Sequence, residues 1–224
     1  DMDDLAFARR VYPGLLSIGG HELIEPTAHL ARAVRPYTML RDPVRRAVSH
    51  FQDQNLRGRA PPSFDEYIDD ELNHDFQVRK IAGGPDLEKA RRLLREEYFF
   101  VGLTERFDES MRLLSSLVPY ALDLRYVRRN VAPDNRFRDA VMNDDRQRAR
   151  IEAANRLDQA LFEWVRDEWY PLLRSRAPAE ALAEPLPVIP DRPVKPARYV
   201  ASRAVHRLRY LPALKRERRR RGFR

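Results

Sequence analysis

YTMLRDPVRRAVSHF, residues 37–51, is the stretch that decides the fold expected for this chain. Its first four residues are typical of a buried strand. Asp42 is then a favourable N-cap residue, and Pro43 is the residue favoured at the first position of a helix. The stretch therefore predicts a strand at 37–40 that leads directly into a helix at 43–56.

Short apolar runs alternate with helical patterns on either side of this stretch. The runs are nearly continuous, which suits strands buried on both faces of a parallel sheet. Alternation of strands and helices predicts an α/β fold in which helices flank a parallel sheet. Further strands are predicted at 15–18, 98–103 and 122–127, and further helices at 64–72, 87–97, 106–118 and 145–173.

The composition excludes several classes of protein. With 224 residues, 43% of them hydrophobic, the chain is long enough for one α/β domain and is not disordered as a whole. No apolar run reaches the roughly 18 residues of a membrane-spanning helix, and no basic segment of a secretory signal opens the chain. Cysteine is absent, which excludes disulfides and a cysteine nucleophile. Five histidines without HExxH spacing predict no metal site.

Positive charge is concentrated at the carboxyl-terminal end. Residues 191–224 hold 13 of the 42 Lys and Arg residues but two of the 34 Asp and Glu residues, a net charge of +11. Residues 1–190 then carry a net charge of −3, which argues against a nucleic acid partner. Six prolines between Pro178 and Pro196 predict an extended linker. We accordingly expect an α/β domain at 1–176, a proline-rich linker at 177–196, and a basic amphipathic helical tail at 197–224.

The junction between the strand and the helix at residues 41–43 predicts an anion site. Helix N-termini attract anions through free N–H groups and through the helix dipole. Arg41 adds a planar cationic fork that suits phosphate. In open α/β sheets, ligands bind at such strand ends. The alternative is a capped surface helix with solvated arginines.

The pattern Arg-Asp-Pro-x-x-Arg-x-x-Ser-x-Phe after a strand resembles the 3′-phosphate-binding segment of sulfotransferases that use 3′-phosphoadenosine 5′-phosphosulfate (PAPS). The resemblance implies that Arg41 and Ser49 hold the 3′-phosphate of the nucleotide. Arg46 matches the second arginine of the pattern.

Three further segments resemble the carbohydrate, Golgi-type branch of that family, which includes heparan sulfate 2-O-sulfotransferase and bacterial relatives. They are FVGLTERF at 100–107, the helix at 73–83, and NRLD at 155–158. The resemblance implies a P-loop-kinase-like parallel sheet. It also implies a place near the acceptor for three residues of the second segment, namely Asn73, Gln77 and Arg79.

A glycine-histidine pair at Gly20-His21 also matches this branch, in which a histidine at that place is the proposed catalytic base. Histidine titrates near neutral pH and is a natural general base for an acceptor hydroxyl. Glu22 is the alternative base, and a loop histidine with a structural hydrogen bond is the alternative role of His21.

The resemblance implies transfer of a sulfuryl group from PAPS, without a metal, to a hydroxyl of a carbohydrate or glycoconjugate, with a carbohydrate or glycolipid as the acceptor partner. The family's Gly/Thr-rich phosphosulfate loop with its lysine is not found, because the first lysine is Lys80. We therefore expect that the chain lacks its first βα unit or that it is a degenerate, non-catalytic relative that binds anions or membranes. We expect a cytoplasmic protein, whose basic tail offers a peripheral attachment to an anionic membrane surface.

Overall fold

The computed structural model describes residues 9–10, 34–61, 63–127, 135–189, 208, 211–213 and 216. The chain divides into two compact units, of which one comprises 24–189 and the other comprises 1–23 together with 190–224. The strands and helices below belong to the unit 24–189. The strand predicted at 15–18, together with His21 and Glu22, lies outside the described residues.

A parallel pair of strands lies within this unit. Strands β1 (Tyr37–Leu40) and β2 (Phe100–Leu103) pair in parallel, in a register that joins Tyr37 to Phe100 and Leu40 to Leu103. All four residues of β2 are buried, as expected of a strand covered on both faces. The strands predicted at 37–40 and 98–103, and their parallel pairing, are confirmed.

Gly102 allows β1 and β2 to pack closely. Its partner in the register is Met39, and a Cβ at position 102 would overlap the thioether of Met39 and crowd the ring of Phe100. Any side chain at this position would have to push the Met39 side chain aside.

The strand predicted at 122–127 is not part of this sheet. Within it, Tyr126 alone makes an isolated bridge, to Val188. Asp123 and Arg125 are exposed and form an ion pair with each other at 2.7 Å. The alternation of polar and apolar residues at 122–127 thus belongs to an extended segment outside the sheet, whose charged side chains face solvent.

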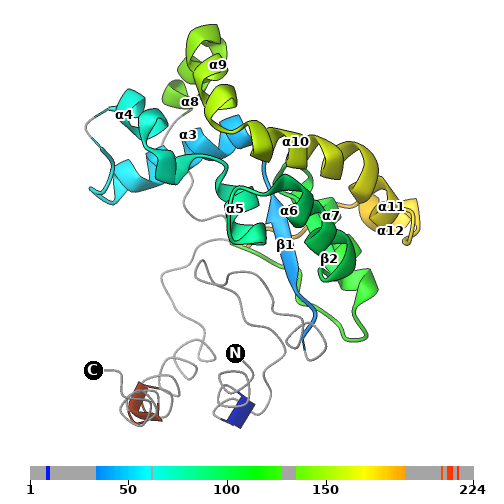
Figure 1. The fold of residues 1–224 in the computed structure, drawn as a ribbon. Helices are drawn as coiled ribbons and strands as arrows, with labels where there is room; N and C mark the ends of the chain where they lie inside the picture. Colours follow the sequence, from blue (N-terminus) through cyan, green and yellow to red (C-terminus); the bar gives the residue numbers. More distant parts are fainter. Residues whose placement is uncertain are drawn as a thin grey trace. The chain divides into compact units, whose positions relative to one another are not determined.

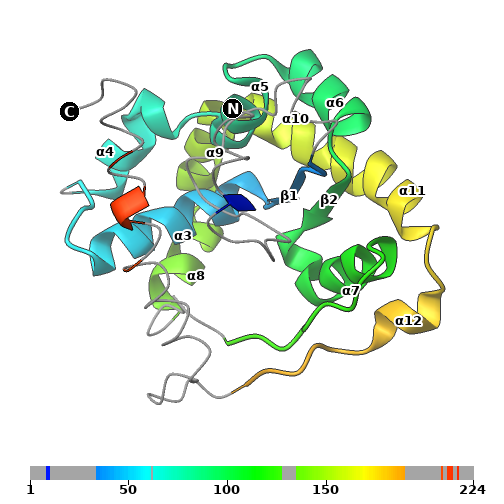
Figure 2. The ribbon, with the colours of Figure 1, turned by 90° about the horizontal axis from the view of Figure 1, so that it is seen from below.

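Helices cover both sides of the strand pair. Figure 2 shows α6 and α10 on one side of β2 and α7 on the other. Residues of all these elements join one hydrophobic core, in which Phe100, Val101 and Leu161 are completely buried. The helices are α5 (Phe76–Ala82), α6 (Leu87–Glu96), α7 (Phe107–Leu117), α10 (Arg156–Trp164) and α11 (Tyr170–Arg174), with a π-helical turn (Val165–Trp169) between the last two.

A second hydrophobic core lies under α3 (Pro43–Leu56). It is rich in aromatic rings, with Phe51 and Phe64 at a ring separation of 5.0 Å and Phe51 and Phe137 at 5.4 Å. The helices that contribute to it gather at one end of the unit in Figure 1. They are α3, α4 (Phe64–Asp69), α8 (Arg136–Asn143) and α9 (Asp145–Ala154).

Most helix predictions agree with the structure, and two need correction. The helices predicted at 43–56, 87–97 and 106–118 are α3, α6 and α7. The helix predicted at 145–173 is interrupted at Asn155, and the one predicted at 64–72 ends at Asp69 before a separate 3₁₀ turn, Glu71–Asn73. Helix α8 was not predicted.

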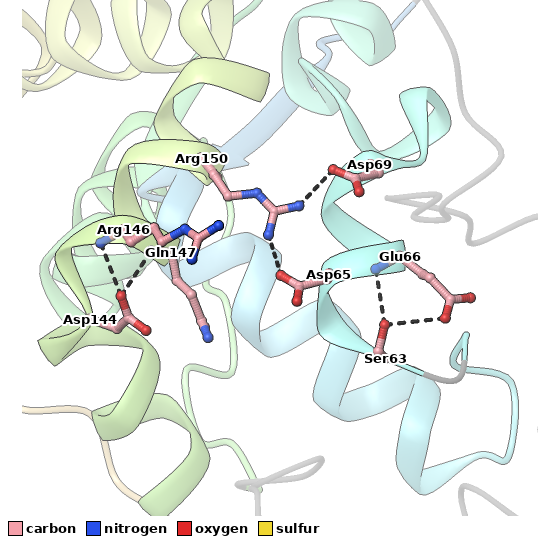
Figure 3. Close-up of polar contacts among 8 residues, drawn as sticks. All are labelled: Ser63, Asp65, Glu66, Asp69, Asp144, Arg146, Gln147 and Arg150. Atoms are coloured by element: carbon pink, nitrogen blue, oxygen red, sulfur yellow. Dashed lines mark hydrogen bonds and ion pairs between the residues drawn. The ribbon is translucent and has the colours of Figure 1, made fainter.

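Two of the carboxylates clustered at residues 65–71 connect α4 to α9. Arg150 of α9 forms ion pairs with Asp65 and with Asp69, the latter at 2.8 Å (Figure 3). Ser63 caps α4 by accepting a hydrogen bond from the Glu66 N–H, and Asp144 caps α9 in the same way. Both carboxylates that pair with Arg150 are exposed, so these ion pairs contribute little to stability.

The proline-rich segment packs on the body as far as Ile189, whereas an extended linker was expected at 177–196. Residues Ala179–Ala183 form α12, and Leu182 and Leu186 are buried. The Arg112 guanidinium donates to the carbonyls of Glu184 and Pro185 at 2.6 and 3.2 Å. Prolines leave carbonyl acceptors without local N–H partners, and Arg112 binds them here.

The fold is therefore mostly helical and of the α/β type, with a small two-stranded parallel sheet. Among the described residues, no helix combines the length and the apolar composition needed to cross a membrane.

Candidate functional site

The candidate site lies where β1 leads into α3. The side chain of Asp42 accepts a hydrogen bond from the Arg45 N–H at 2.9 Å, and Pro43 occupies the first turn. The Arg46 N–H donates to the Asp42 carbonyl at 2.8 Å, which begins the helical hydrogen bonding. The predicted cap is thus confirmed, and it places the N-terminus of a 14-residue helix directly after Arg41.

The carboxyl end of β2 lies beside this junction. Strand β2 ends at Leu103 and is followed by a 3₁₀ turn, Thr104–Arg106. Glu105 of that turn accepts a hydrogen bond from the Asp42 N–H at 3.0 Å. Because parallel strands end at the same edge of a sheet, FVGLTERF and RDPVRR are joined here, 63 residues apart in the chain.

Arg41 presents a half-buried cation at this edge. Among the residues that the structure describes, none accepts a hydrogen bond from its guanidinium or forms an ion pair with it. Burial lowers the pKa of Arg41, and the charges of Arg45 and Arg46 lower it further, while Glu105 and Asp42 act in the opposite direction. A desolvated cation beside two others is stabilised by an anion.

Ser49 lies on α3, one helical turn beyond Arg45 and therefore on the same face of the helix. Its side chain is half-buried, and its hydroxyl makes no hydrogen bond within the described ranges. Arg45 is exposed, and its guanidinium forms no ion pair with the described part of the chain. The structure thus brings Arg41 and Arg45 to the start of α3, with Ser49 further along it.

Arg46 faces α5 and contacts the protein itself. Its Nη2 donates to the Asn73 carbonyl at 3.0 Å, and its guanidinium lies over the Phe76 ring, 4.8 Å from the ring centre. Its Nε is buried with no hydrogen-bond partner among the described atoms. Packing on an aromatic ring and a carbonyl makes Arg46 a link between α3 and α5.

Asn73 and Gln77, predicted to lie near the acceptor, both use their amides to bind main-chain groups. The Asn73 side chain donates to the Tyr67 carbonyl at 2.9 Å. Gln77 accepts from the Arg41 N–H at 2.9 Å and donates to the Arg41 carbonyl, also at 2.9 Å. Arg79 is different, because its half-buried guanidinium has no hydrogen-bond partner in the described segments.

The N-termini of α5 and α10 cap each other, an arrangement that the sequence did not reveal. Asp158 of α10 accepts hydrogen bonds from the N–H groups of Gln77 and Val78 at 3.0 and 2.7 Å. Asp75, which precedes α5, accepts from those of Leu157 and Asp158 at 2.8 and 3.1 Å. Burial of Asp158 raises its pKa, and the two N–H bonds act against that rise. The NRLD segment therefore has a structural function here.

A second polar network holds the end of β2. Ser110 of α7 accepts from the Leu103 N–H at 3.0 Å and lies 3.1 Å from the Tyr170 hydroxyl. That hydroxyl donates to Glu109, which also binds Arg174. Burial raises the pKa of Tyr170 to about 12, so the phenol remains protonated at neutral pH.

The histidines that the structure describes are His50 and His74, and both have protein partners. His50 Nδ1 lies 2.9 Å from the Tyr67 hydroxyl, and His74 Nε2 lies 2.7 Å from the Ile68 carbonyl. Across the described ranges, no three histidine or acidic side chains gather in a geometry that would hold a metal. A small pocket beside His74, lined also by Tyr67 and Asn155, has room for about one water molecule.

Comparison of the chain with protein-family models, with curated proteins and with solved structures finds no match.

Proposed function

We propose that this protein is a sulfotransferase that moves a sulfuryl group from PAPS to a hydroxyl of a carbohydrate or glycoconjugate. In this proposal, β1 and β2 belong to a P-loop-kinase-like parallel sheet, and the nucleotide binds at its carboxyl edge. The support comes from the residues at the start of α3 and from the resemblance of RDPVRRAVSHF to the family's 3′-phosphate segment.

One observation carries the proposal: the guanidinium of Arg41 lies half-buried beside the N-terminus of α3, without a partner among the described side chains. A cation held in this way and flanked by Arg45 favours a compact, highly charged anion. A 3′-phosphate supplies two charges and several oxygens, and the Arg41 fork can bind two of these oxygens at once.

The reaction would proceed by in-line displacement at sulfur. The acceptor oxygen forms a bond to sulfur while the bond from sulfur to the 5′-phosphate oxygen breaks, and adenosine 3′,5′-bisphosphate leaves. The acceptor hydroxyl loses its proton to a general base, for which we propose His21, with Glu22 as the alternative. Neither step requires a metal.

Each site residue receives a distinct role in this proposal. Arg41 and Ser49 bind the 3′-phosphate, and Arg45 adds charge at the same end of α3. Arg79, whose guanidinium has no hydrogen-bond partner among the described residues, binds the acceptor. Arg46 and Asn73 link α3, α4 and α5, because each already binds a main-chain carbonyl.

Nucleotide binding tests this function directly. Calorimetry with adenosine 3′,5′-bisphosphate should give an affinity that falls at least tenfold in Arg41→Ala, since a charge-assisted contact worth about 1.5–3 kcal/mol is lost. Arg92→Ala removes an exposed arginine of α6 as a charge control and should leave the affinity unchanged. In the complete protein, His21→Ala should keep the affinity while turnover falls about a hundredfold.

Two results would contradict the proposal. Equal affinities of wild type and Arg41→Ala would remove the anion site from the start of α3. Nucleotide binding that depends on Arg41, without sulfuryl transfer by the complete protein, would support the second candidate, a non-catalytic anion-binding relative.

A further inference from the structure

We propose that Gln77 is a positioning residue, which fixes the main chain of Arg41 so that its guanidinium faces the bound anion. This inference rests on the proposed function and deepens it. It assigns to Gln77 a role that acts through Arg41, in place of the direct acceptor contact implied by the family resemblance.

The first step of the argument is the pair of hydrogen bonds between one side chain and one residue's main chain. Gln77 Oε1 accepts from the Arg41 N–H, and Gln77 Nε2 donates to the Arg41 carbonyl, each at 2.9 Å. A strand neighbour makes the same two contacts in a sheet. Gln77 therefore extends the pairing of β1 by one residue, beyond its last partner contact at Leu40.

The second step is that Gln77 is itself fixed. It is 9% exposed, and its N–H donates to the completely buried carboxylate of Asp158 at 3.0 Å. The adjacent Val78 N–H donates to the other carboxylate oxygen at 2.7 Å. The amide that holds Arg41 is thus anchored through α5 to α10, which is part of the sheet's hydrophobic core.

The third step is the contrast between the main chain and the side chain of Arg41. Its main chain is bound on both polar groups, and the next N–H, of Asp42, is bound by Glu105. Its guanidinium has no partner among the described residues. A fixed main chain that carries an unpaired cationic side chain preorganises an anion site, because the residue loses little conformational freedom when the anion binds.

A double-mutant cycle tests this role. Gln77→Met keeps the length of the side chain and removes both hydrogen bonds. In a protein that keeps Arg41, Gln77→Met should lower the affinity for adenosine 3′,5′-bisphosphate about tenfold. In a protein that carries Arg41→Ala, the same substitution should change this affinity less than twofold. Gln159→Met, the same substitution in α10 at a residue that bonds Glu163, is the control and should bind as wild type.

A second probe separates positioning from loss of structure. Adenosine 5′-phosphate lacks the 3′-phosphate, so its weaker affinity should be the same in wild type and Gln77→Met. Gln77→Asn retains an amide, one methylene too short to bridge Arg41, and should reproduce the Arg41-dependent loss even where Gln77→Met fails to fold.

Each remaining outcome overturns the inference. Gln77 does not act through Arg41 if both Gln77 variants bind the bisphosphate as tightly as wild type. The same conclusion follows if the Gln77 substitution lowers the affinity equally with Arg41 and with Arg41→Ala. The proposed function survives either result. A wild-type protein that does not bind the bisphosphate overturns the proposed function, and the role of Gln77 with it.

Discussion

At the scale of single residues, the arginines of this protein divide into those that bind the protein and those that do not. Arg112 binds the carbonyls of the proline-rich segment, and Arg150 binds two carboxylates of α4. Arg41 binds none of the described residues through its guanidinium, although it is half-buried. Burial of a charged group without a partner costs free energy. A ligand that pairs with the guanidinium removes this cost, and it therefore binds more tightly.

Tyr170 gives a pH-dependent prediction at the same scale. Its pKa is raised from 10.0 to about 12, so between these values the folded protein keeps a proton that the unfolded chain releases. Stability therefore falls as pH rises through this range, by up to about 1.4 kcal/mol per pH unit. Urea unfolding of wild type and Tyr170→Phe from pH 9 upwards should show the wild-type advantage shrinking above about pH 10.

The comparison with Tyr170→Phe cancels the titration of other tyrosines and lysines. Tyr170→Phe also loses the hydrogen bond to Glu109, which should cost about 1 kcal/mol at neutral pH. A stability difference that stays constant up to pH 12 would show that the hydroxyl titrates as it does in the unfolded chain.

Residue-level prediction from the sequence succeeded where the cause was local. The cap at Asp42 and the proline at position 43 act on the helix that follows at once, and both are observed. The amide of Gln77 acts on Arg41, 36 residues away in the chain. Its local sequence carries no sign of that contact, and so a place near the acceptor was expected instead.

At the scale of elements, the junction of α5 and α10 shows why helix boundaries were harder to predict. The apolar pattern from 145 to 173 is continuous enough to predict one helix. The helix is broken because Asn155 and Asp158 turn to α5, where Asn155 accepts from the Asp75 N–H at 3.2 Å. Partners some 80 residues apart are not visible in a periodicity.

Asp75 tests this mutual capping. Its Oδ1 accepts both N–H groups at the start of α10, and its main chain has a φ of 45°. Asp75→Ala should destabilise the fold by about 2–4 kcal/mol, since two donors lose their partner and alanine is strained at positive φ. Asp75→Asn keeps the acceptor oxygen and tolerates the conformation, and should lose under about 1 kcal/mol.

Asp75→Gly separates the two causes, and urea unfolding measures all three variants. Glycine removes the strain and leaves the donors unpaired, so it should be more stable than Asp75→Ala and less stable than Asp75→Asn. A glycine variant as stable as wild type would show that the cap bonds contribute nothing.

At the scale of the whole molecule, charge separates the body from the tail. Residues 1–190 carry a net charge of −3 and residues 191–224 a net charge of +11. The amphipathic helix expected at 197–224 lies mostly outside the described residues. Two of its apolar residues that are described, Leu208 and Leu211, are 77% and 38% exposed. Exposed leucines among arginines are typical of segments that lie on an anionic membrane surface.

The tail should therefore attach the protein to anionic membranes without any part in the chemistry. Deletion of residues 197–224 should abolish co-sedimentation with vesicles of phosphatidylcholine and phosphatidylglycerol, and should spare the affinity for adenosine 3′,5′-bisphosphate. Each basic residue near such a surface contributes about 1 kcal/mol, so added salt should release the wild-type protein. Pure phosphatidylcholine vesicles are the control and should not bind it.

A variant with Leu208→Gln and Leu211→Gln separates the apolar contribution from the charge. It keeps every basic residue of the tail, and so it should still bind at low salt but dissociate at a lower salt concentration than wild type, because the apolar stripe no longer inserts between the headgroups. Equal sedimentation of wild type and the truncated protein would end the proposal of a membrane-attached tail. A loss of nucleotide affinity on truncation would instead assign the tail to the nucleotide site.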